Sequence, residues 1–366
     1  MATAKYEIEI WNKDGIPVAD IRQICSNFSW SKTLNGSESV GFTVDLKRME
    51  SILESVGYKN DPFGFMEVGR HDIRIKRNGK YIVGANIYRF NYSSSYNSVT
   101  MRVECVGYLN FYKTQYITAQ YTDTPQQDIM WDVINRCNQK TGGDYGVRQG
   151  LHSGETYNRD RSYERKEVAS LIQQMSNIIN GCDFEFTPDK LFNTYAVKGT
   201  YRPSVRLTYP GNIQSFNFSR SLDNVSNYIY GIGSGTGDEA VQTQAEDPNS
   251  EDYLYRREKV SIWNSVTEQE TINEHTDSTL HATANIIELP NITLRDNVLD
   301  MSEIETGDTV VVDLGAFASI AHVSGDYRIT TIECHVDEND SESVTLGFDG
   351  LDVEQLIQNQ ENEANG

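Results

Sequence analysis

The feature that most constrains the fold is a stretch of alternating apolar and polar residues between residues 305 and 348. Alternation with a period of two is typical of a strand that buries one face and exposes the other. It continues on both sides of a polar turn at residues 337–342, so it predicts an antiparallel meander in a small barrel or sandwich. The apolar positions are Val310, Val311, Val312, Ile332, Cys334, Val336, Val344, Leu346 and Phe348.

A similar pattern occurs at residues 66–107. The segment V-G-R-H-D-I-R-I from Val68 resembles T-G-D-T-V-V-V from Thr306, and N-S-V-T-M-R-V from Asn97 resembles E-S-V-T-L-G-F from Glu342. In both copies a Gly-led strand, a middle strand and a loop precede the shared S-V-T. Chance is the alternative explanation, because β-meanders share turn chemistry. We expect a structural duplication, because the same elements occur in the same order in both stretches.

Charge and composition exclude several classes of protein. The 366 residues include 32 Lys and Arg against 53 Asp and Glu, a net charge of −21. Affinity for nucleic acid comes from cationic side chains that displace phosphate counterions, so a DNA-binding protein is excluded. No apolar run approaches the roughly 20 residues that span a bilayer. The N-terminus enters a strand directly and lacks a signal-peptide profile, which predicts synthesis and assembly in a cytoplasm.

The cysteines and tyrosines carry no sign of a cofactor. Five cysteines form no CxxC motif, which argues against a disulfide framework or a zinc site. The 21 tyrosines suit β-structure and protein contact surfaces, because the ring packs while the hydroxyl stays wet. The cysteines are Cys25, Cys105, Cys137, Cys182 and Cys334.

The middle of the chain changes to helical periodicity. Thr124-Pro125 opens one predicted helix, with Thr124 as N-cap, and a second runs from about Glu164 to Asn180. A hairpin around Asp189-Lys190 follows. Near the start of the chain, the sequence also predicts a short helix from Lys47 to about Val56. The middle segment is therefore a small α+β module between two β-rich units.

The second β-rich unit is interrupted. Strands are expected across residues 203–236, whereas residues 237–258 are acidic and weakly patterned and are expected to form a mobile loop. A helix is expected around Ile272–Ile287, and the polar C-terminal tail is expected to fray.

Three sequence features could suggest a phosphate or metal site, and none of them matches a known motif. The run from Gly231 to Gly237 matches neither the Rossmann nor the Walker pattern. His275 and His281 are six residues apart, which does not suit metal ligands on one helix face. The acidic turn containing Asp337, Glu338, Asp340 and Glu342 lacks the spacing of an EF-hand loop. A flexible strand exit, a solvated helix and a solvated hairpin tip are the favoured interpretations, so no catalytic, cofactor-binding or metal residue is predicted.

Several segments resemble the tail hub proteins of tailed bacteriophages, including baseplate hubs and the hub region of tail-tip proteins. The resemblance rests on Y-E-I-E-I-W-N and W-S-K-T-L-N-G-S-E-S-V-G-F-T-V near the start and on R-S-Y-E-R-K-E-V-A-S-L-I-Q-Q-M at 161–175. It also rests on P-G-N-I-Q-S-F-N-F-S-R-S-L-D-N-V-S-N at 210–227 and on G-D-T-V-V-V with Y-R-I-T-T-I within 307–332. The resemblance covers nearly the whole chain, from the first of these motifs to the last.

The resemblance implies an α+β, mostly β fold with two similar, small, antiparallel, tube-like β-barrels. The expected units are residues 1–111 (first barrel), 112–202 (α+β module), 203–236 with 286–350 (second barrel), 237–285 (inserted acidic loop and helix) and 351–366 (polar tail).

The function implied is a non-enzymatic hub at the distal end of a phage tail, without cofactors. Three chains with two barrels each would form a pseudo-sixfold ring around the DNA exit channel. The expected partners are the tail tube or distal tail protein on one face and a spike, fibre or tip protein on the other. Tape-measure protein or DNA would pass through the lumen. A cell-wall peptidase or glycosidase, or a carbohydrate- or receptor-binding tail protein, are the alternatives.

Overall fold

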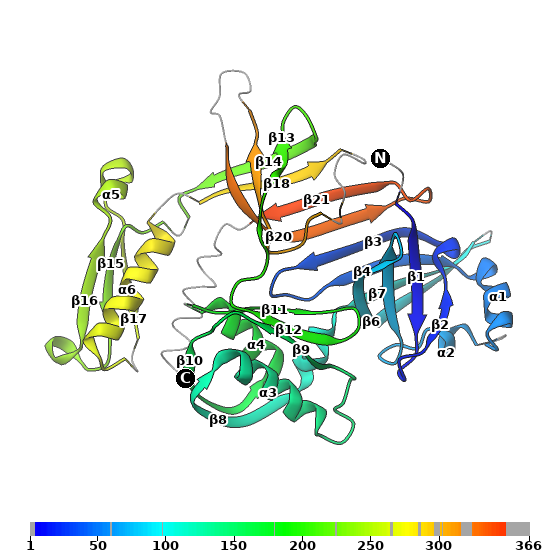
Figure 1. Ribbon diagram of the computed structural model, residues 1–366, viewed down its shortest axis with the longest axis horizontal. Coiled ribbons are helices and arrows are strands. Elements are labelled where there is room, and N and C mark those ends of the chain that lie inside the picture. Colours follow the sequence, from blue (N-terminus) through cyan, green and yellow to red (C-terminus); the bar gives the residue numbers. More distant parts are fainter. Residues whose placement is uncertain are drawn as a thin grey trace.

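The computed structural model describes residues 4–58, 61–96, 98–178, 180–223, 225–263, 266–284, 287–295, 301, 303–315 and 324–348. The fold is α+β and mostly β, as predicted (Figure 1). No described helix is long and apolar enough to cross a membrane.

The first β-unit is built from strands that bury alternate residues. In β1, Tyr6, Ile8 and Ile10 are buried between less buried neighbours. Asn78 takes a left-handed conformation at the tight turn between β5 and β6. Helix α1 begins after Asp45, whose carboxylate caps it. The elements are β1 (Tyr6–Trp11), β2 (Pro17–Asp20), η1 (Arg22–Ile24), β3 (Cys25–Thr33), β4 (Ser39–Asp45), α1 (Leu46–Ser55), α2 (Pro62–Phe65), β5 (Asp72–Arg77), β6 (Lys80–Ser94) and β7 (Val99–Val106).

The second β-unit repeats the first in its strand order. The first is hydrogen-bonded in the order β3-β4-β7-β6-β5-β1 and the second in the order β14-β18-β21-β20-β19-β13. Each of these six strands therefore has a counterpart at the same place in chain order, which supports the predicted duplication. The elements are β13 (Tyr201–Thr208), β14 (Ile213–Ser221), β18 (Ile287–Leu294), β19 (Thr309–Asp313), β20 (Ser324–Val336) and β21 (Glu342–Phe348).

The equivalence extends to single hydrogen bonds. Gly69 N donates to Ile87 O, and Gly307 N donates to Ile329 O. Both glycines have positive φ, +77° and +98°, and a register shift follows Ile87 and Ile329 alike. Ile87 thus corresponds to Ile329. In this alignment Met101, rather than Val99 of the S-V-T motif, corresponds to Val344, a difference of two residues that leaves the side chains on the same face of the sheet. One difference remains, because β1–β5 is antiparallel and β13–β19 is parallel.

The two β-units share one sheet and one apolar core. Strand β20 pairs with β3, so the sheet runs through both units, and a single buried cluster extends from Ala4 to Phe348. The described pairings do not close either unit into a barrel, which differs from the expected tube-like barrels. Strand β20 pairs with β19 through residues 324–328 and with β3 through residues 331–336.

The α+β module lies below the two β-units with its own core (Figure 1). The predicted turn at Asp189-Lys190 is confirmed. The second helix begins later than predicted, because residues 158–167 pair with β8 as a strand. Thr124 also belongs to β8 and does not cap α3. The elements are η2 (Tyr108–Thr114), β8 (Tyr116–Pro125), α3 (Gln126–Asn138), β9 (Arg148–Ser153), β10 (Asn158–Glu167), α4 (Val168–Asn177), β11 (Asp183–Phe186) and β12 (Leu191–Tyr195).

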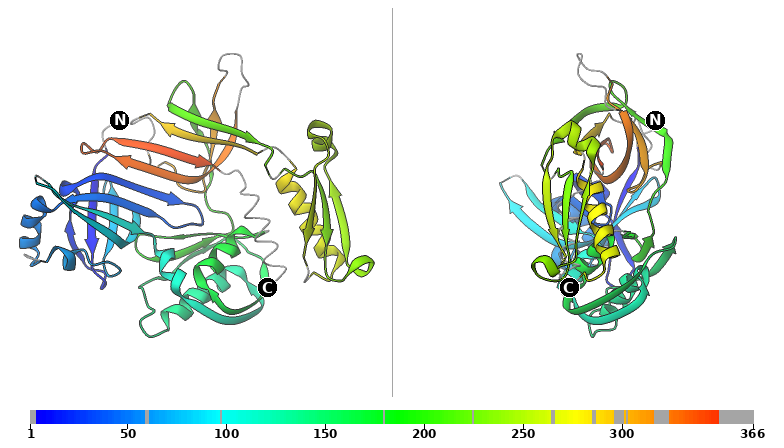
Figure 2. Two further views of the ribbon diagram at one scale, coloured as in Figure 1. Left: turned by 180° about the vertical axis from the view of Figure 1, so that it is seen from behind. Right: turned by 90° about the vertical axis from the view of Figure 1, so that its left-hand side faces the viewer.

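The predicted mobile loop at residues 237–258 is wrong, because this segment contains a strand and a helix. β15 pairs with β16 and β17 as a separate sheet, and α6 packs on it (Figure 2). The excursion therefore begins at Tyr228 rather than after residue 236. The other predicted unit boundaries stay predictions, and the tail at 351–366 lies outside the described residues. The elements are β15 (Tyr228–Ile232), η3 (Gly237–Glu239), β16 (Gln242–Glu246), α5 (Pro248–Leu254), β17 (Glu258–Ile262) and α6 (Gln269–Thr283).

Candidate functional site

The two β-units are joined by the pairing of β20 with β3, which we call the seam. Residues 331–336 of β20 pair antiparallel with residues 28–33 of β3, with Cys334 opposite Trp30. Leu34 N extends the ladder by donating to Thr330 O at 2.8 Å. Cys334 is 2% exposed and Trp30 5%, so the seam belongs to the core rather than to a surface contact.

A buried ion pair between Arg77 and Glu342 stabilises the seam. Glu342 of β21 accepts bidentate hydrogen bonds from Arg77 of β5 at 2.6 and 2.9 Å, and a third from the Tyr6 hydroxyl at 2.5 Å. At the hairpin tip, Arg22 pairs with Asp340 at 2.5 Å and donates to Asp337 O. The acidic turn thus serves mainly to bind arginines of the other unit, and the prediction of a solvated tip is wrong for Asp340 and Glu342.

Asp183 of β11 lies where all three units meet. Its Oδ2 accepts from Arg328 of β20 at 2.5 Å and from the Lys198 backbone N–H at 2.7 Å, and its Oδ1 accepts from Asn35 of the β3–β4 turn. Asn35 in turn accepts from Phe184 N–H at 2.9 Å through its own Oδ1. One buried carboxylate therefore holds the first β-unit, the module and the second β-unit together.

A second contact ties the module to the first β-unit. The turn residues Asp189 and Lys190 form reciprocal ion pairs with Arg74 and Asp72 of β5, both at 2.6 Å. Arg74 and Asp72 are buried, so each buried charge has a partner of opposite sign. The turn that the sequence predicts is thus a docking element.

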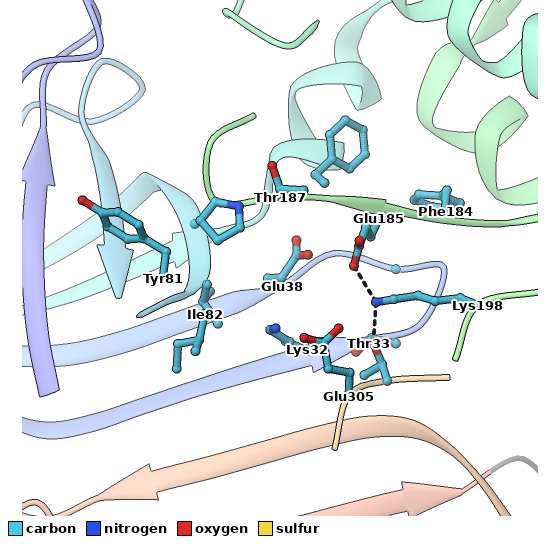
Figure 3. A pocket seen from close by; sticks show the side chains of 16 residues that line it. Lys32, Thr33, Glu38, Tyr81, Ile82, Phe184, Glu185, Thr187, Lys198 and Glu305 are labelled. Atoms are coloured by element: carbon cyan, nitrogen blue, oxygen red, sulfur yellow. Dashed lines mark hydrogen bonds and ion pairs between the residues drawn. The ribbon is translucent and has the colours of Figure 1, made fainter. Parts of the chain in front are cut away.

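A small charged cavity of about 150 Å³ lies at the same junction (Figure 3). Its lining comes from the β3–β4 hairpin, β6, the β11–β12 hairpin and residues 305–306. Lys198 pairs with Glu185 at 2.5 Å. Glu185 is partly buried, which alone would raise its pKa, but the charge and hydrogen bond of Lys198, with hydrogen bonds from Tyr195 and Asn193, lower the pKa to about 2.

The pKa of Glu38, in the same cavity, is shifted in the opposite direction to that of Glu185. Burial raises the pKa of its carboxyl to about 7, and its Oε2 makes no hydrogen bond to any described residue. Burial also lowers the pKa of Lys32. Two carboxyls with divergent pKa values are a known arrangement for acid–base catalysis. Ligand pockets, however, usually hold about 300–1,000 Å³, so this cavity is smaller than a typical ligand pocket.

The other sequence candidates have structural roles or stay unplaced. A Cβ on Gly231 would overlap the Thr276 hydroxyl of α6, so the glycine lets strand and helix approach closely. His275 stacks on Trp263 with 5.4 Å between ring centroids, while the His281 side chain lies outside the described residues. Among the residues the structure describes, no group of three or more His, Cys, Asp or Glu is arranged to hold a metal ion.

A second repeat in the sequence marks the seam strand, and the S-V-T comparison misses it. β3 carries F-S-W-S-K-T-L from Phe28 to Leu34, and its counterpart β14 carries F-N-F-S-R-S-L from Phe216 to Leu222. The shared pattern is Phe, a polar residue, an aromatic, Ser, a basic residue, a hydroxyl residue and Leu. This match would have identified β3 and β14 as counterparts from the sequence alone.

Solved structures similar to this chain are bacteriophage and secretion-system tail proteins. A tail protein of Neisseria meningitidis MC58 matches with a TM-score of 0.68 at 12% identity, covering 97% of this chain and 98% of that one. A 43 kDa tail protein of prophage MuSo2 from Shewanella oneidensis matches with a TM-score of 0.66 at 11% identity, covering 96% and 99%.

A third match is a component of a secretion system. An E. coli component of the type VI secretion system, described as structurally similar to the T4 tail proteins gp27 and gp5, matches with a TM-score of 0.52 at 12% identity, covering 89% and 73%. No protein-family model and no curated protein matches the sequence. The chain therefore has the fold of bacteriophage tail proteins over almost its whole length, which confirms the resemblance seen in the sequence.

Proposed function

We propose that this protein is a structural hub at the distal end of a phage tail. Three copies form a ring with pseudo-sixfold symmetry that adapts the hexameric tail tube to a threefold spike, fibre or tip. The observation that carries the proposal is the duplicated strand order, with the two copies joined edge to edge by β20 and β3.

The duplication matters because of symmetry. Three chains with two equivalent β-units give six similar units around one axis, which match a sixfold tube on one face and a threefold partner on the other. The ion pairs at Glu342 and Asp183 hold the two units of one chain rigidly. Rigid units are what such an adaptor needs, because both partners must bind a fixed spacing.

The wet face of the shared sheet suits a channel wall. An open groove of about 280 Å³ crosses the seam and is lined largely by hydroxyl groups, and the chain as a whole is strongly acidic. On the same sheet, Arg89 is paired with Glu104 rather than left available for phosphate. A wall of hydroxyls and paired charges offers DNA little to bind. The groove lining is Ser29, Trp30, Ser31, Ser39, Glu333, Cys334, His335, Ser343 and Thr345.

The proposal is tested by the mass and shape of the purified protein. We expect mass measurement across a concentration series to reach three times 41.5 kDa. Averaged electron micrographs of that species should show a ring with six lobes and threefold symmetry. A particle with another symmetry, or no association at any concentration, would contradict the ring.

Enzymatic activity is tested separately. The proposal is of a non-enzymatic protein, and a zymogram on cell-wall material should show no clearing. Clearing by the purified chain would support the peptidase or glycosidase alternative. Substituting Glu38 and Glu185, the carboxyls with the most divergent pKa values in the junction cavity, would then be the first step in locating the activity.

A further inference from the structure

We infer that the ring is closed by strand pairing between copies: the outer edge of β6 in one copy pairs antiparallel with β14 of the next copy. This inference rests on the proposed function, and it names the interface that the ring would use. The partner is a second copy of this chain, and the contact has the same form as the β20–β3 seam inside each chain.

The argument begins with the counterparts of the two seam strands. Within one chain, the seam joins β20 of the second unit to β3 of the first. By the strand order, β20 corresponds to β6 and β3 corresponds to β14. The remaining joint in a ring of equivalent units is therefore between a β6 edge and a β14 edge.

Both of these edges are open in the part of the chain that the structure describes. β14 stands at one end of the strand order and pairs with β18 alone. β6 pairs with β5 only as far as Asn86, so residues 87–94 have β7 on one side and no strand on the other. An exposed edge of this length is a template for pairing with another chain.

Burial shows what the β6 edge lacks. Because Ile87 corresponds to Ile329, Tyr92 corresponds to Cys334 and Ser94 to Val336. Cys334 and Val336 are 2% and 1% exposed under the seam, whereas Tyr92 is 54% exposed and Ser94 is exposed. Tyr88, which precedes this stretch, is 55% exposed. In the second unit, β3 of the neighbouring unit covers Cys334 and Val336. In the first unit, no described strand covers Tyr92 and Ser94.

The β14 edge has the matching sequence. Its F-N-F-S-R-S-L pattern reproduces F-S-W-S-K-T-L of β3, the strand that already pairs in this way. Both strands also carry a register shift near their start, between Ser26 and Ser29 in β3 and between Ile213 and Ser215 in β14. The two strands therefore share a sequence pattern and an irregularity near their start.

The repeat also fixes the register. In the seam, His335 lies opposite Ser29 and Val336 opposite Phe28. The equivalent pairs between copies are Ser93 with Asn217 and Ser94 with Phe216. A contact between two different edges is heterologous, so each copy offers one edge of each kind and the assembly grows head to tail until it closes.

The register is tested by disulfide trapping in the full-length chain. The double variant Ser93→Cys with Asn217→Cys places two thiols opposite each other, and paired residues on neighbouring strands have Cα atoms about 4.5–5.5 Å apart, within disulfide range. The five native cysteines are buried and free, so oxidised wild-type protein gives the background. We expect mild oxidation to give covalent dimers and trimers that dithiothreitol dissolves.

The matched control moves one thiol along the same strand. Ser93→Cys with Gln214→Cys displaces it by three residues, about 10 Å at 3.3 Å per residue, and should cross-link at least tenfold less. Both Gln214 and Asn217 are exposed, so neither change disturbs the core. Equal cross-linking by the two variants would overturn the register.

A charge on the edge gives an independent readout. Tyr92→Lys should weaken self-association at least tenfold, measured by sedimentation, because it places a cation where the neighbour must pack. Tyr253→Lys, at a residue 70% exposed on α5, should leave association unchanged. If the protein forms trimers but neither variant behaves as expected, the edge pairing is wrong and the hub proposal stands. If the protein never associates and no cross-link forms, both are wrong.

Discussion

Arg328 of β20 donates to Asp183 of β11 with a nitrogen–oxygen distance of 2.5 Å, and the same carboxylate accepts from Asn35 of the first β-unit. The second β-unit is thereby connected to the first through a side chain of the module. Asp183 is 7% exposed, so its charge is compensated by protein groups rather than by water.

Replacing this carboxylate should destabilise the whole chain. Asp183→Ala would leave the Arg328 guanidinium without its ion-pair partner, and breaking a buried pair from one side costs about 3–5 kcal/mol. We expect the urea midpoint to fall accordingly. Asp144→Ala, which removes an exposed pair with Arg148, should cost less than about 1 kcal/mol. Equal losses would show that Asp183 has no special role at the junction.

Glu38 should make stability depend on pH. Burial disfavours the charged form and raises the pKa of this carboxyl from its ordinary value of 4.5 to about 7 in the folded protein. The folded state therefore holds this proton more tightly than the unfolded state. The stability that this gives is fully present below about pH 4.5 and is lost as the pH rises through 7.

Glu38→Gln removes that dependence and supplies the measurement. The free energy of unfolding of the variant relative to wild type should be higher at pH 8 than at pH 5 by on the order of 1–3 kcal/mol. Comparing the difference at the two pH values cancels the other titrating groups. A difference that does not change with pH would show that the carboxyl is ionised in the folded protein at both.

Tyr6 contributes to the lock at Glu342 through its hydroxyl alone. Tyr6→Phe keeps the ring packed on Phe28 and removes the hydroxyl, which donates to the buried Glu342 carboxylate and also accepts from Trp30 Nε1 at 3.4 Å. Hydrogen bonds to charged groups contribute about 1.5–3 kcal/mol, and we expect a loss of that size in thermal or urea unfolding. Tyr201→Phe, at a tyrosine 54% exposed, is the control and should change stability by less than about 0.5 kcal/mol.

Hydrogen exchange should distinguish the paired seam from the open edges. In the dissociated protein, amides of residues 28–33 and 331–336 should exchange at least tenfold more slowly than those of residues 88–94. Association should slow exchange at residues 88–94 and in β14. Protection that stays unchanged in the trimer would place the contact between copies elsewhere.

The local structure is readable from the sequence where it depends on neighbouring residues. Period-two alternation identifies β1 and β20, and Gly57, a typical C-terminal cap residue, marks the end of α1. Residues 158–167 were predicted in part as helix because Val168, Leu171 and Ile172 continue a helical stripe immediately after them. Their strand conformation comes from pairing with β8, which is a tertiary effect. The same reason explains the missed strand β16 at residues 242–246, whose polar sequence pairs with β15.

The sequence by itself determined the class of fold, the turn at Asp189-Lys190 and the duplication. Each of these is visible as a pattern in the sequence: a periodicity, a turn motif or a repeated motif. Only the tertiary structure decided that β20 pairs with β3 and that Asp340 and Glu342 bind arginines of the other unit. Backbone hydrogen bonds between edges look the same for any residue, and the two arginines lie 318 and 265 positions from their partners Asp340 and Glu342, so they leave no local pattern. The seam became visible only once the edges lay side by side.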